Sequence, residues 1–432
     1  MNKVSLKFSV NTLTKVHLGA IGSVKFRLAK GKPFEVALPT GRNVPALCVN
    51  ADKNWTVWFA SGNPENVRVR FDGNICTVQF GADHSEPLSL KKTTFQKWSE
   101  VVAWLRTQLG LDKRLARPTG FKRVYFFDIH DPEDGLIQGF DDVRRGLEDI
   151  AKAGYAKDAV LYLPGWDGAY DGTYPDYRAS KSAGGWKALE QLNREAADMG
   201  AQLLLHLNHW GLSDSRMASY PKLKGAFQKN PDGSFLKWPG SNWKGGSNPL
   251  YYLKPDHPEL IKVMKARVDE IVARGIRGIF LDQFGAPIGL DSKRVRMAKT
   301  YEKNVCGGHP DAVFGSELPM PETVGSFRLS QMWGPAWSGM AEFPVTVSEL
   351  CADVYDGFVQ LFGHLGTPAP YPTRYAYTNY VYLAQYGWQE AFKRAWKQHK
   401  DAHVLPTLRL HASKRRENIA LIKSLLGKRR AR

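Results

Sequence analysis

The chain has 432 residues, of which 43% are hydrophobic and 24% are charged, so it can bury one large core or two modest ones and is not a disordered chain. With a mean hydropathy of -0.38, no stretch reaches the roughly 20 apolar residues that a membrane-spanning helix needs. Lysines interrupt the N-terminal segment where a secretory leader is apolar. We therefore expect a cytoplasmic protein, or one released without a classical signal peptide, for instance with a phage-like particle.

The net charge of +18 is distributed unevenly along the chain. Residues 1–120 carry +10 and residues 391–432 carry +11, which leaves -3 for the part between them. A protein that binds nucleic acid along its main cleft concentrates cations there, so this distribution argues against nucleic acid. The basic ends either serve solubility or attach the protein to an anionic polysaccharide or a larger assembly.

The first 110 residues are typical of a small antiparallel β-domain. Short apolar runs are separated by Gly, Asn, Asp and Pro, and an amphipathic helix is predicted at 94–109. Residues 111–120 are charged and contain Gly and Pro, which predicts a linker. A second domain then occupies residues 121–432 and ends in a basic tail.

From residue 121 onward, an apolar strand, a polar loop and an amphipathic helix alternate. The five clear strands are predicted in the segments VYFFDIH, AVLYLPGW, AQLLLHLNHW, GIRGIFLDQF and DAVFGSELP. This pattern predicts the α/β class and a (β/α)₈ TIM barrel preceded by the β-domain. FVQLFGHL and HVLPTLRL are candidates for the seventh and eighth strands, and RRENIALIKSLL for the closing helix.

Polar and aromatic residues follow these strands at their C-terminal ends, where barrel enzymes carry their chemistry. In strand order they are Asp128 and His130; Trp166, Asp167, Tyr170 and Asp171; His206, Asn208 and Trp210; Asp282 and Gln283; and Glu317. Any one of them has a plausible structural role, but their recurrence after five strands favours a site. We expect Asp282 and Glu317 to be catalytic and the others to bind substrate.

Asp282 and Glu317 form the sharpest pair. Asp282 ends an apolar strand, where an unpaired carboxylate is costly to bury, so its exit into a polar cleft is favoured. Glu317 ends the next strand, and adjacent strands lie about 4.8 Å apart, which allows the roughly 5 to 5.5 Å separation of a retaining glycosidase. The structural alternative is that Glu317 caps a helix and Asp282 pairs with an arginine.

These residues resemble the α-glycosidase barrels, which include the α-amylase, α-galactosidase and endo-α-N-acetylgalactosaminidase superfamilies. The likeness lies in GIFLD, in the glutamate that ends the fifth strand, and in the segments GWDGAYDGTYPDY and LLLHLNHWG, and it covers residues 121–322. It implies that Asp282 is a nucleophile and Glu317 an acid/base. It also implies that Asp128, Asp167 and Asn208 position the substrate, and that the β-domain corresponds to an accessory sandwich. For a third carboxylate, Asp353 and Glu342 are candidates.

Aromatic residues in the predicted rim loops agree with a carbohydrate substrate, because indole rings stack on the C–H faces of sugars. Besides those named above, they are Trp238, Trp243, Trp333 and Trp337. Of these we expect Trp333 to bind substrate. The insertion at 213–253 is rich in Gly, Asn and Trp and is predicted to be a loop that faces the substrate.

The most specific function that the sequence supports is hydrolysis of an α-glycosidic bond in an oligo- or polysaccharide, with retention and without a cofactor or metal. Two alternatives stay open. Asp128, His130, His206 and His209 have ligand types suited to a divalent metal, which would serve a metal-assisted esterase or hydrolase. The barrel could instead be an inactive glycan-binding module of a larger assembly. The four cysteines, Cys48, Cys76, Cys306 and Cys351, show no metal-ligand spacing and are expected to be reduced, structural thiols.

Overall fold

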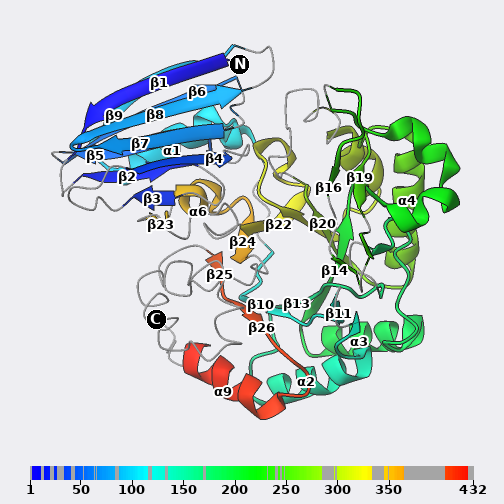
Figure 1. Cartoon of the computed structure of the whole chain (residues 1–432). Coiled ribbons are helices and arrows are strands. Elements are labelled where there is room, and N and C mark those ends of the chain that lie inside the picture. Colours follow the sequence, from blue (N-terminus) through cyan, green and yellow to red (C-terminus); the bar gives the residue numbers. More distant parts are fainter. Residues whose placement is uncertain are drawn as a thin grey trace. The chain divides into compact units, whose positions relative to one another are not determined.

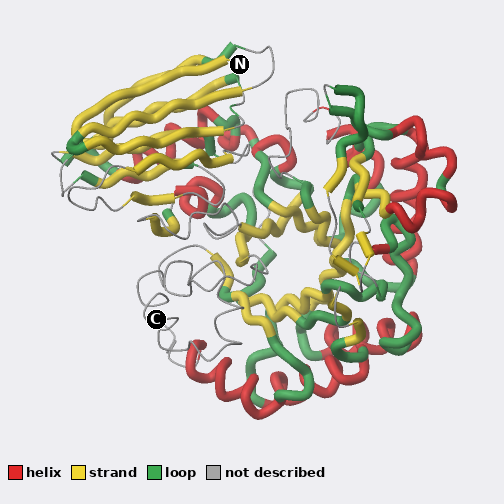
Figure 2. The backbone as a smooth tube through the Cα atoms, viewed as in Figure 1, coloured by secondary structure: helices red, strands yellow, loops and turns green. Residues whose placement is uncertain are grey.

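A computed structural model of the chain is shown in Figures 1 and 2. It describes residues 2–10, 14–19, 24–26, 34–39, 44–51, 53–62, 64, 66–82, 87–114, 119–131, 135–168, 172–230, 232–238, 242–243, 246–247, 249–284, 296, 299–332, 345–348, 350–363 and 404–426. The chain divides into two compact units. The first is Met1–Thr119, Gly285–Val295 and Ser316–Leu405, and the second is Gly120–Phe284, Arg296–Gly315 and Pro406–Arg432. The domain boundaries predicted from the sequence stay predictions.

The first unit contains the predicted antiparallel β-structure, arranged as two sheets. One has the order β1-β8-β7-β4, with β1 (Asn2–Ser9), β8 (Ile75–Ala82), β7 (Asn66–Asp72) and β4 (Phe34–Pro39). The other has the order β23-β3-β2-β5-β6-β9, with β23 (Val345–Val347), β3 (Val24–Phe26), β2 (Lys15–Leu18), β5 (Ala46–Ala51), β6 (Asn54–Ser61) and β9 (Ser89–Phe95). Apolar residues from both sheets, among them Val16, Val69 and Val78, pack into one core.

A second core of the first unit packs around helix α1 (Trp98–Gln108), which is the helix predicted at 94–109. The N-terminus of α1 is closed by Glu100, whose carboxylate accepts a hydrogen bond from the backbone N–H of Lys97 at 3.0 Å. Helix α6 (Leu350–Tyr355) belongs to the same core, as does Leu111 of the 3₁₀ helix η1 (Leu111–Lys113). Another 3₁₀ helix, η6 (Pro321–Thr323), precedes β22 (Phe327–Met332).

The parallel strands form one sheet in the order β25-β24-β22-β21-β20-β14-β13-β10-β26. They are β10 (Arg123–Phe126), β13 (Ala159–Leu163), β14 (Gln202–Asn208), β20 (Gly278–Asp282), β21 (Val313–Glu317), β22 (Phe327–Met332), β24 (Gln360–Gly363), β25 (Val404–Leu405) and β26 (Thr407–Arg409). The first and last strands of this order are consecutive in the chain and separated by Pro406 alone. The sheet therefore closes on itself, and the predicted (β/α)₈ barrel is confirmed.

Helices cover the outer face of the second unit's strands (Figure 2). They are α2 (Phe140–Lys152), α3 (Gly185–Asp198), α4 (Pro258–Ala273) and α9 (Arg415–Leu426). In α2, Val143, Leu147 and Ile150 are buried at a spacing of four and three residues, the stripe that turns one face of a helix toward a core. Because helices cover the outer face and side chains fill the barrel, all five residues of β13 are buried.

The insertion after β14 is folded in the second unit. Its three-stranded sheet has the order β15-β19-β16, with β15 (Gly211–Ser213), β19 (Leu250–Tyr252) and β16 (Lys237–Trp238). Smaller elements of the second unit are the pairs β11 (His130–Asp131) with β12 (Gly135–Leu136) and β17 (Asn242–Trp243) with β18 (Gly246–Ser247), the 3₁₀ helices η3 (Asp214–Ser219) and η4 (Pro221–Ala226), and the π-helical turn η5 (Glu302–Cys306). Within the described part of the chain, none of the helices has the length and apolar character needed to span a bilayer.

Candidate active site

Asp282 occupies the C-terminal end of β20, and its carboxylate is held by the neighbouring strand. Nδ2 of Asn208 donates a hydrogen bond to Oδ2 of Asp282 at 3.2 Å, and Nε2 of His206 lies 4.0 Å from the same oxygen. The Asp282 side chain is 17% exposed, whereas that of His206 is 5% exposed. A carboxylate that is mostly buried but retains one accessible surface, and that is fixed by a neutral donor, is suited to contact a substrate.

Gln283 extends this contact to the insertion. Its backbone has φ +58°, a left-handed conformation that ends the strand and turns the chain. Its Oε1 accepts from Nδ2 of Asn208 at 3.0 Å and from Nε1 of Trp210 at 3.2 Å, while its Nε2 donates to the Tyr252 hydroxyl at 3.2 Å. Gln283 therefore links the residue beside Asp282 to two aromatic rings, which lie 4.9 Å apart.

The backbone of Asn208 is fixed by a buried tyrosine. The Tyr177 hydroxyl accepts from the N–H of Asn208 and donates to its carbonyl oxygen, both at 2.8 Å. Burial raises the pKa of the Tyr177 hydroxyl well above its ordinary value, so the hydroxyl stays protonated and retains both roles. The Oδ1 atom of Asn208 also accepts from the N–H of Trp210 at 3.1 Å. The Asn208 amide is thus oriented with its NH₂ toward Asp282.

His206, predicted to bind substrate, is enclosed by protein groups. Nδ1 lies within hydrogen-bond distance of the Tyr162 hydroxyl, and Nε2 lies 3.1 Å from the Tyr174 hydroxyl. The imidazole stacks on Phe280 with ring centroids 5.7 Å apart. Trp166 is also fully buried, and its Nε1 donates to the carbonyl of His206 at 2.9 Å. The contacts of His206 and Trp166 with other protein groups thus help to fix the shape of the site.

His209 contacts the backbone of Asp282. Its Nδ1 is 3.0 Å from the carbonyl oxygen of Asp282, and its ring stacks on Trp210 with centroids 4.8 Å apart. Burial lowers the pKa of His209 to about 3, although its hydrogen bond to Asp282 acts in the opposite direction. The imidazole is therefore neutral at ordinary pH and donates its Nδ1 proton to the carbonyl.

Asp128 joins the first strand of the barrel to the last. Its carboxylate forms an ion pair and hydrogen bond with Nε of Arg409, and the two side chains are 9% and 22% exposed. Gln138 reinforces the contact, because its Nε2 donates to the carbonyl of Asp128 and its Oε1 accepts from the N–H of Ala412, both at 2.7 Å. The structure thus gives Asp128 an arginine partner within the barrel.

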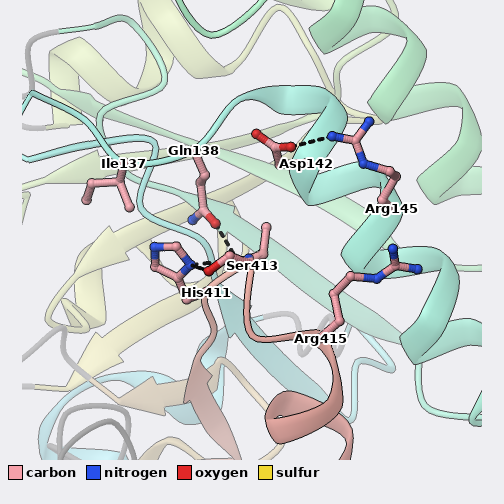
Figure 3. A pocket seen from close by; sticks show the side chains of 8 residues that line it. Ile137, Gln138, Asp142, Arg145, His411, Ser413 and Arg415 are labelled. Atoms are coloured by element: carbon pink, nitrogen blue, oxygen red, sulfur yellow. Dashed lines mark hydrogen bonds and ion pairs between the residues drawn. The ribbon is translucent and has the colours of Figure 1, made fainter.

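A cavity of about 160 Å³ lies beside this contact (Figure 3). Its lining residues are Ile137, Gln138, Asp142, Arg145, His411, Ala412, Ser413 and Arg415. These residues belong to the loops and helices that follow β10 and β26, and Asp282 is not among them. Arg145 is paired with Asp142, so the cavity walls are partly neutralised.

The remaining residues predicted after the first two strands are engaged locally. Nδ1 of His130 is 3.0 Å from the carbonyl of Gly165, and its Nε2 is 3.2 Å from the Ser182 hydroxyl. Burial lowers the pKa of His130. Oδ2 of Asp167 accepts from the Thr173 hydroxyl at 3.3 Å. Tyr170, Asp171, Trp333, Trp337 and Glu342 lie outside the described residues.

Glu317 ends β21, the strand that follows β20 in the sheet order. The side chain is buried, and it belongs to the first unit, whereas Asp282 belongs to the second. That the two act as a pair stays a prediction. Asp353, a candidate for the third carboxylate, lies on α6, where its Oδ2 accepts from Nε1 of Trp98 at 2.6 Å.

The residues suggested for a metal site are not brought together. No group of three His, Cys, Asp or Glu side chains is close enough to hold a metal ion anywhere among the described residues. The histidines of the set are instead hydrogen-bonded to backbone carbonyls, a serine and tyrosine hydroxyls, as given above. The chemistry that this region supports is hydrogen bonding and carboxylate chemistry around Asp282.

Four residues at the site were missed by reasoning from sequence: Tyr162, Tyr177, Tyr252 and Arg409. Tyr162 lies within the apolar run AVLYL, in which all residues are apolar and no alternation indicates which side chains point into the barrel. Tyr177 lies in GWDGAYDGTYPDY, a segment in which other residues were chosen. Arg409 could have been found, because it occurs at the end of the last predicted strand, where the other site residues also lie.

No protein-family model and no curated protein sequence matches this chain. Among solved structures, the ligand-free α-N-acetylgalactosaminidase of Bifidobacterium bifidum aligns with 97% of this chain and 74% of its own, at 15% identity and a TM-score of 0.69. In a complex of the same bifidobacterial protein, 82% of this chain aligns with 64% of that chain, at 15% identity and a TM-score of 0.65. This chain therefore spans about two thirds to three quarters of that protein's length.

A second similar structure is the α-galactosidase of Thermus thermophilus in complex with stachyose. It aligns with 99% of this chain and 93% of its own, at 12% identity and a TM-score of 0.61. At such identities the likeness shows the fold. The chain therefore has the same (β/α)₈ barrel fold as these two glycosidases, the fold that its strand-end motifs indicate.

Proposed function

We propose that the protein is a retaining glycoside hydrolase that cleaves an α-glycosidic bond in an oligo- or polysaccharide. The observation that carries the proposal is Asp282, a partly exposed carboxylate at a barrel strand end that accepts a hydrogen bond from Asn208. The same barrel fold occurs in an α-N-acetylgalactosaminidase and an α-galactosidase. We infer an α-linked galactose or N-acetylgalactosamine as the cleaved sugar.

In the proposed reaction, Asp282 attacks the anomeric carbon and displaces the leaving oxygen, which takes a proton from the Glu317 carboxyl group. A covalent glycosyl ester on Asp282 results. The Glu317 carboxylate then removes a proton from water, and the water oxygen attacks the same carbon and releases Asp282. Two inversions restore the original anomeric configuration, and the enzyme returns to its starting state.

The neighbours of Asp282 support this role. Asn208 donates to Oδ2 of Asp282 and so fixes the orientation of the carboxylate. The neutral His209 holds the backbone of Asp282. We assign Asp128 and Asp167 to hydrogen bonds with sugar hydroxyls at the edge of the site.

The deciding experiment is an activity screen with aryl α-glycosides, including p-nitrophenyl α-galactoside and its N-acetylgalactosamine counterpart. We expect wild type to release product of retained configuration, as seen by proton NMR, and Asp282→Asn to be inactive on every substrate. For Glu317→Ala, activated aryl glycosides should still react, and azide should yield a glycosyl azide of the substrate's configuration. Inverted product, or full activity in Asp282→Asn, contradicts the proposal.

Two controls separate the alternatives. Activity lost with a chelator and restored by a divalent metal would point to metal-assisted hydrolysis. Polysaccharide binding without release of reducing ends would point to an inactive glycan-binding barrel.

A further inference from the structure

The small sheet β15-β19-β16 carries large aromatic side chains on two opposite faces, and only one face is turned toward Asp282. Tyr252 defines that face. Its hydroxyl accepts from Nε2 of Gln283 at 3.2 Å, and its ring lies 4.9 Å from that of Trp210. Gln283 in turn accepts from Asn208, the residue that holds Asp282.

Trp238 lies on the same face as Tyr252. In the register of β16 with β19, Trp238 is paired with Leu250, and directly paired residues share a face. Leu250 and Tyr252 are two residues apart and therefore also share a face. The Trp238 side chain thus projects from the face of the sheet that contacts Gln283.

The register also gives the direction in which Trp238 lies. Tyr252 is paired with Gly211, which comes shortly after the end of β14, whereas Leu250 is paired with Ser213, farther along the outgoing chain. Two residues along a strand span about 7 Å. Trp238 is therefore about 7 Å farther out from the strand end than Tyr252. It is also 37% exposed, while Tyr252 and Leu250 are buried.

Phe235 belongs to the opposite face. Its ring lies 6.2 Å from that of Tyr251 and 4.7 Å from that of Phe227, and it is 43% exposed. Tyr251 is the neighbour of Tyr252 and points to the other side of β19. Two similarly exposed aromatic rings thus lie on opposite faces of one small sheet, and only Trp238 shares the face that reaches the Asp282 network.

We propose that Trp238 is a sugar-binding residue that stacks against a monosaccharide of the leaving group, next to the sugar that is cleaved. This inference rests on the proposed function and names its substrate class as an oligosaccharide. An indole offers a flat apolar surface that fits the C–H face of a pyranose, and stacking removes apolar surface of both partners from water. The register sets Trp238 about 7 Å beyond Tyr252 on the face that reaches Gln283, so we assign the stacking to a sugar outside the one that Asp282 attacks.

The test compares stachyose, a galactosyl oligosaccharide, with p-nitrophenyl α-galactoside in wild type, Trp238→Ala, Trp238→Phe and the matched control Phe235→Ala. The measured quantity is the ratio of kcat/KM for stachyose to that for the aryl glycoside, which is insensitive to a loss of folded protein. We expect Trp238→Ala to lower this ratio about tenfold, the factor that corresponds to about 1.4 kcal/mol of lost stacking. Trp238→Phe should recover part of the loss, and Phe235→Ala should keep the wild-type ratio.

Calorimetric binding of stachyose and maltotetraose to the Asp282→Asn protein, with and without Trp238→Ala, supplies a readout that does not need turnover. If a tetrasaccharide binds and Trp238→Ala weakens its affinity for the protein by about tenfold, the inference is supported. An unchanged affinity and ratio, an equal effect of Phe235→Ala, or no binding of either tetrasaccharide overturns it. If no aryl α-glycoside is hydrolysed but Trp238-dependent binding persists, the proposed function fails and the sugar-binding role of Trp238 stands.

Discussion

Asn208 and Asp282 are direct partners in the parallel register of β14 with β20, and the amide of the first donates to the carboxylate of the second. Because paired residues at the ends of neighbouring strands share a face, the strand register itself brings the two side chains together. The carboxylate thereby has a fixed neutral donor that needs no loop to hold it. This pairing makes the strand ends the rigid part of the site.

Removing this donor should impair turnover. We expect Asn208→Ala to lower kcat/KM on an aryl α-glycoside about 10- to 100-fold, because a hydrogen bond to a charged group contributes about 1.5 to 3 kcal/mol. Asn208→Asp should be at least as impaired, since it places a second negative charge beside Asp282. Asn193→Ala is the matched control: its amide donates to the carbonyl of Gly275, away from Asp282. Wild-type kcat/KM in Asn208→Ala would refute the assignment.

The side chains of Asp128 and Arg409 should contribute to the free energy of unfolding as a coupled pair. Arg409→Met leaves a mostly buried carboxylate without its partner and should lower the free energy of unfolding by about 3 to 5 kcal/mol. The double variant Asp128→Asn with Arg409→Met should recover most of that loss, because no charge is then left unpaired. Urea unfolding of wild type, the single variants Asp128→Asn and Arg409→Met, and the double variant measures the coupling. Additive losses in the double variant would show that the two side chains are independent.

His206 should depend on the two tyrosine hydroxyls that hold its ring. Each ring nitrogen of His206 lies within hydrogen-bond distance of one tyrosine hydroxyl. We expect Tyr162→Phe and Tyr174→Phe each to lower the free energy of unfolding by about 0.5 to 1.5 kcal/mol. In a His206→Leu background the same changes should cost less, which a double-mutant cycle detects. A coupling energy of zero would show that His206 is not the partner of these two hydroxyls.

Acidification should destabilise the fold through His209. Its pKa is lowered to about 3 in the folded protein, whereas an unfolded histidine titrates near 6.5, so the unfolded state binds the proton more tightly. Its contribution is fully present above about pH 6.5 and is lost as the pH falls toward 3. At pH 5 the loss amounts to about 2 kcal/mol relative to pH 7. Urea unfolding of wild type and His209→Asn at both pH values tests this, since the variant should lack that part of the pH dependence.

The four cysteine thiols should be inert in the native protein. All four are buried, and burial raises the pKa of Cys76 to about 12. We expect a thiol reagent at pH 8 to label none of them rapidly before unfolding and all four after it. A Lys7→Cys variant, altered at an exposed position of β1, is the control that should react at once. Rapid labelling of the wild-type protein would contradict this picture.

The barrel could be predicted from the sequence because its first strands are apolar on both faces and alternate with amphipathic helices. The sixth strand, β22, could not be placed. Its sequence FRLSQM contains Ser330 and Gln331, which are both buried. Ser330 is satisfied by Ser316 on β21, to whose carbonyl it donates at 3.1 Å. When the hydrogen-bond partner of a buried polar residue lies on another strand, the sequence of its own segment does not indicate that the residue is buried.

The same reasoning explains which site residues were found. Asn208 and Asp282 end apolar runs, so the sequence pattern predicts that they lie at the ends of strands. Tyr252 and Arg409 reach the site only through tertiary contacts, with Gln283 and Asp128 respectively. Such contacts depend on which strands become neighbours when the sheet closes, and that information is spread over the whole chain.

The pairing of β23 with β3 also affects how the protein is made. Val345–Val347 forms the outer neighbour of Val24–Phe26, roughly 320 residues earlier in the chain. At a synthesis rate of about 5 to 20 residues per second, β3 emerges from the ribosome roughly 15 to 60 s before its partner exists. During that interval the nascent chain carries an unpaired sheet edge, the kind of surface that recruits a strand from another molecule. Slow translation of the central segment thus lengthens the period in which polysomes of this protein are vulnerable to aggregation.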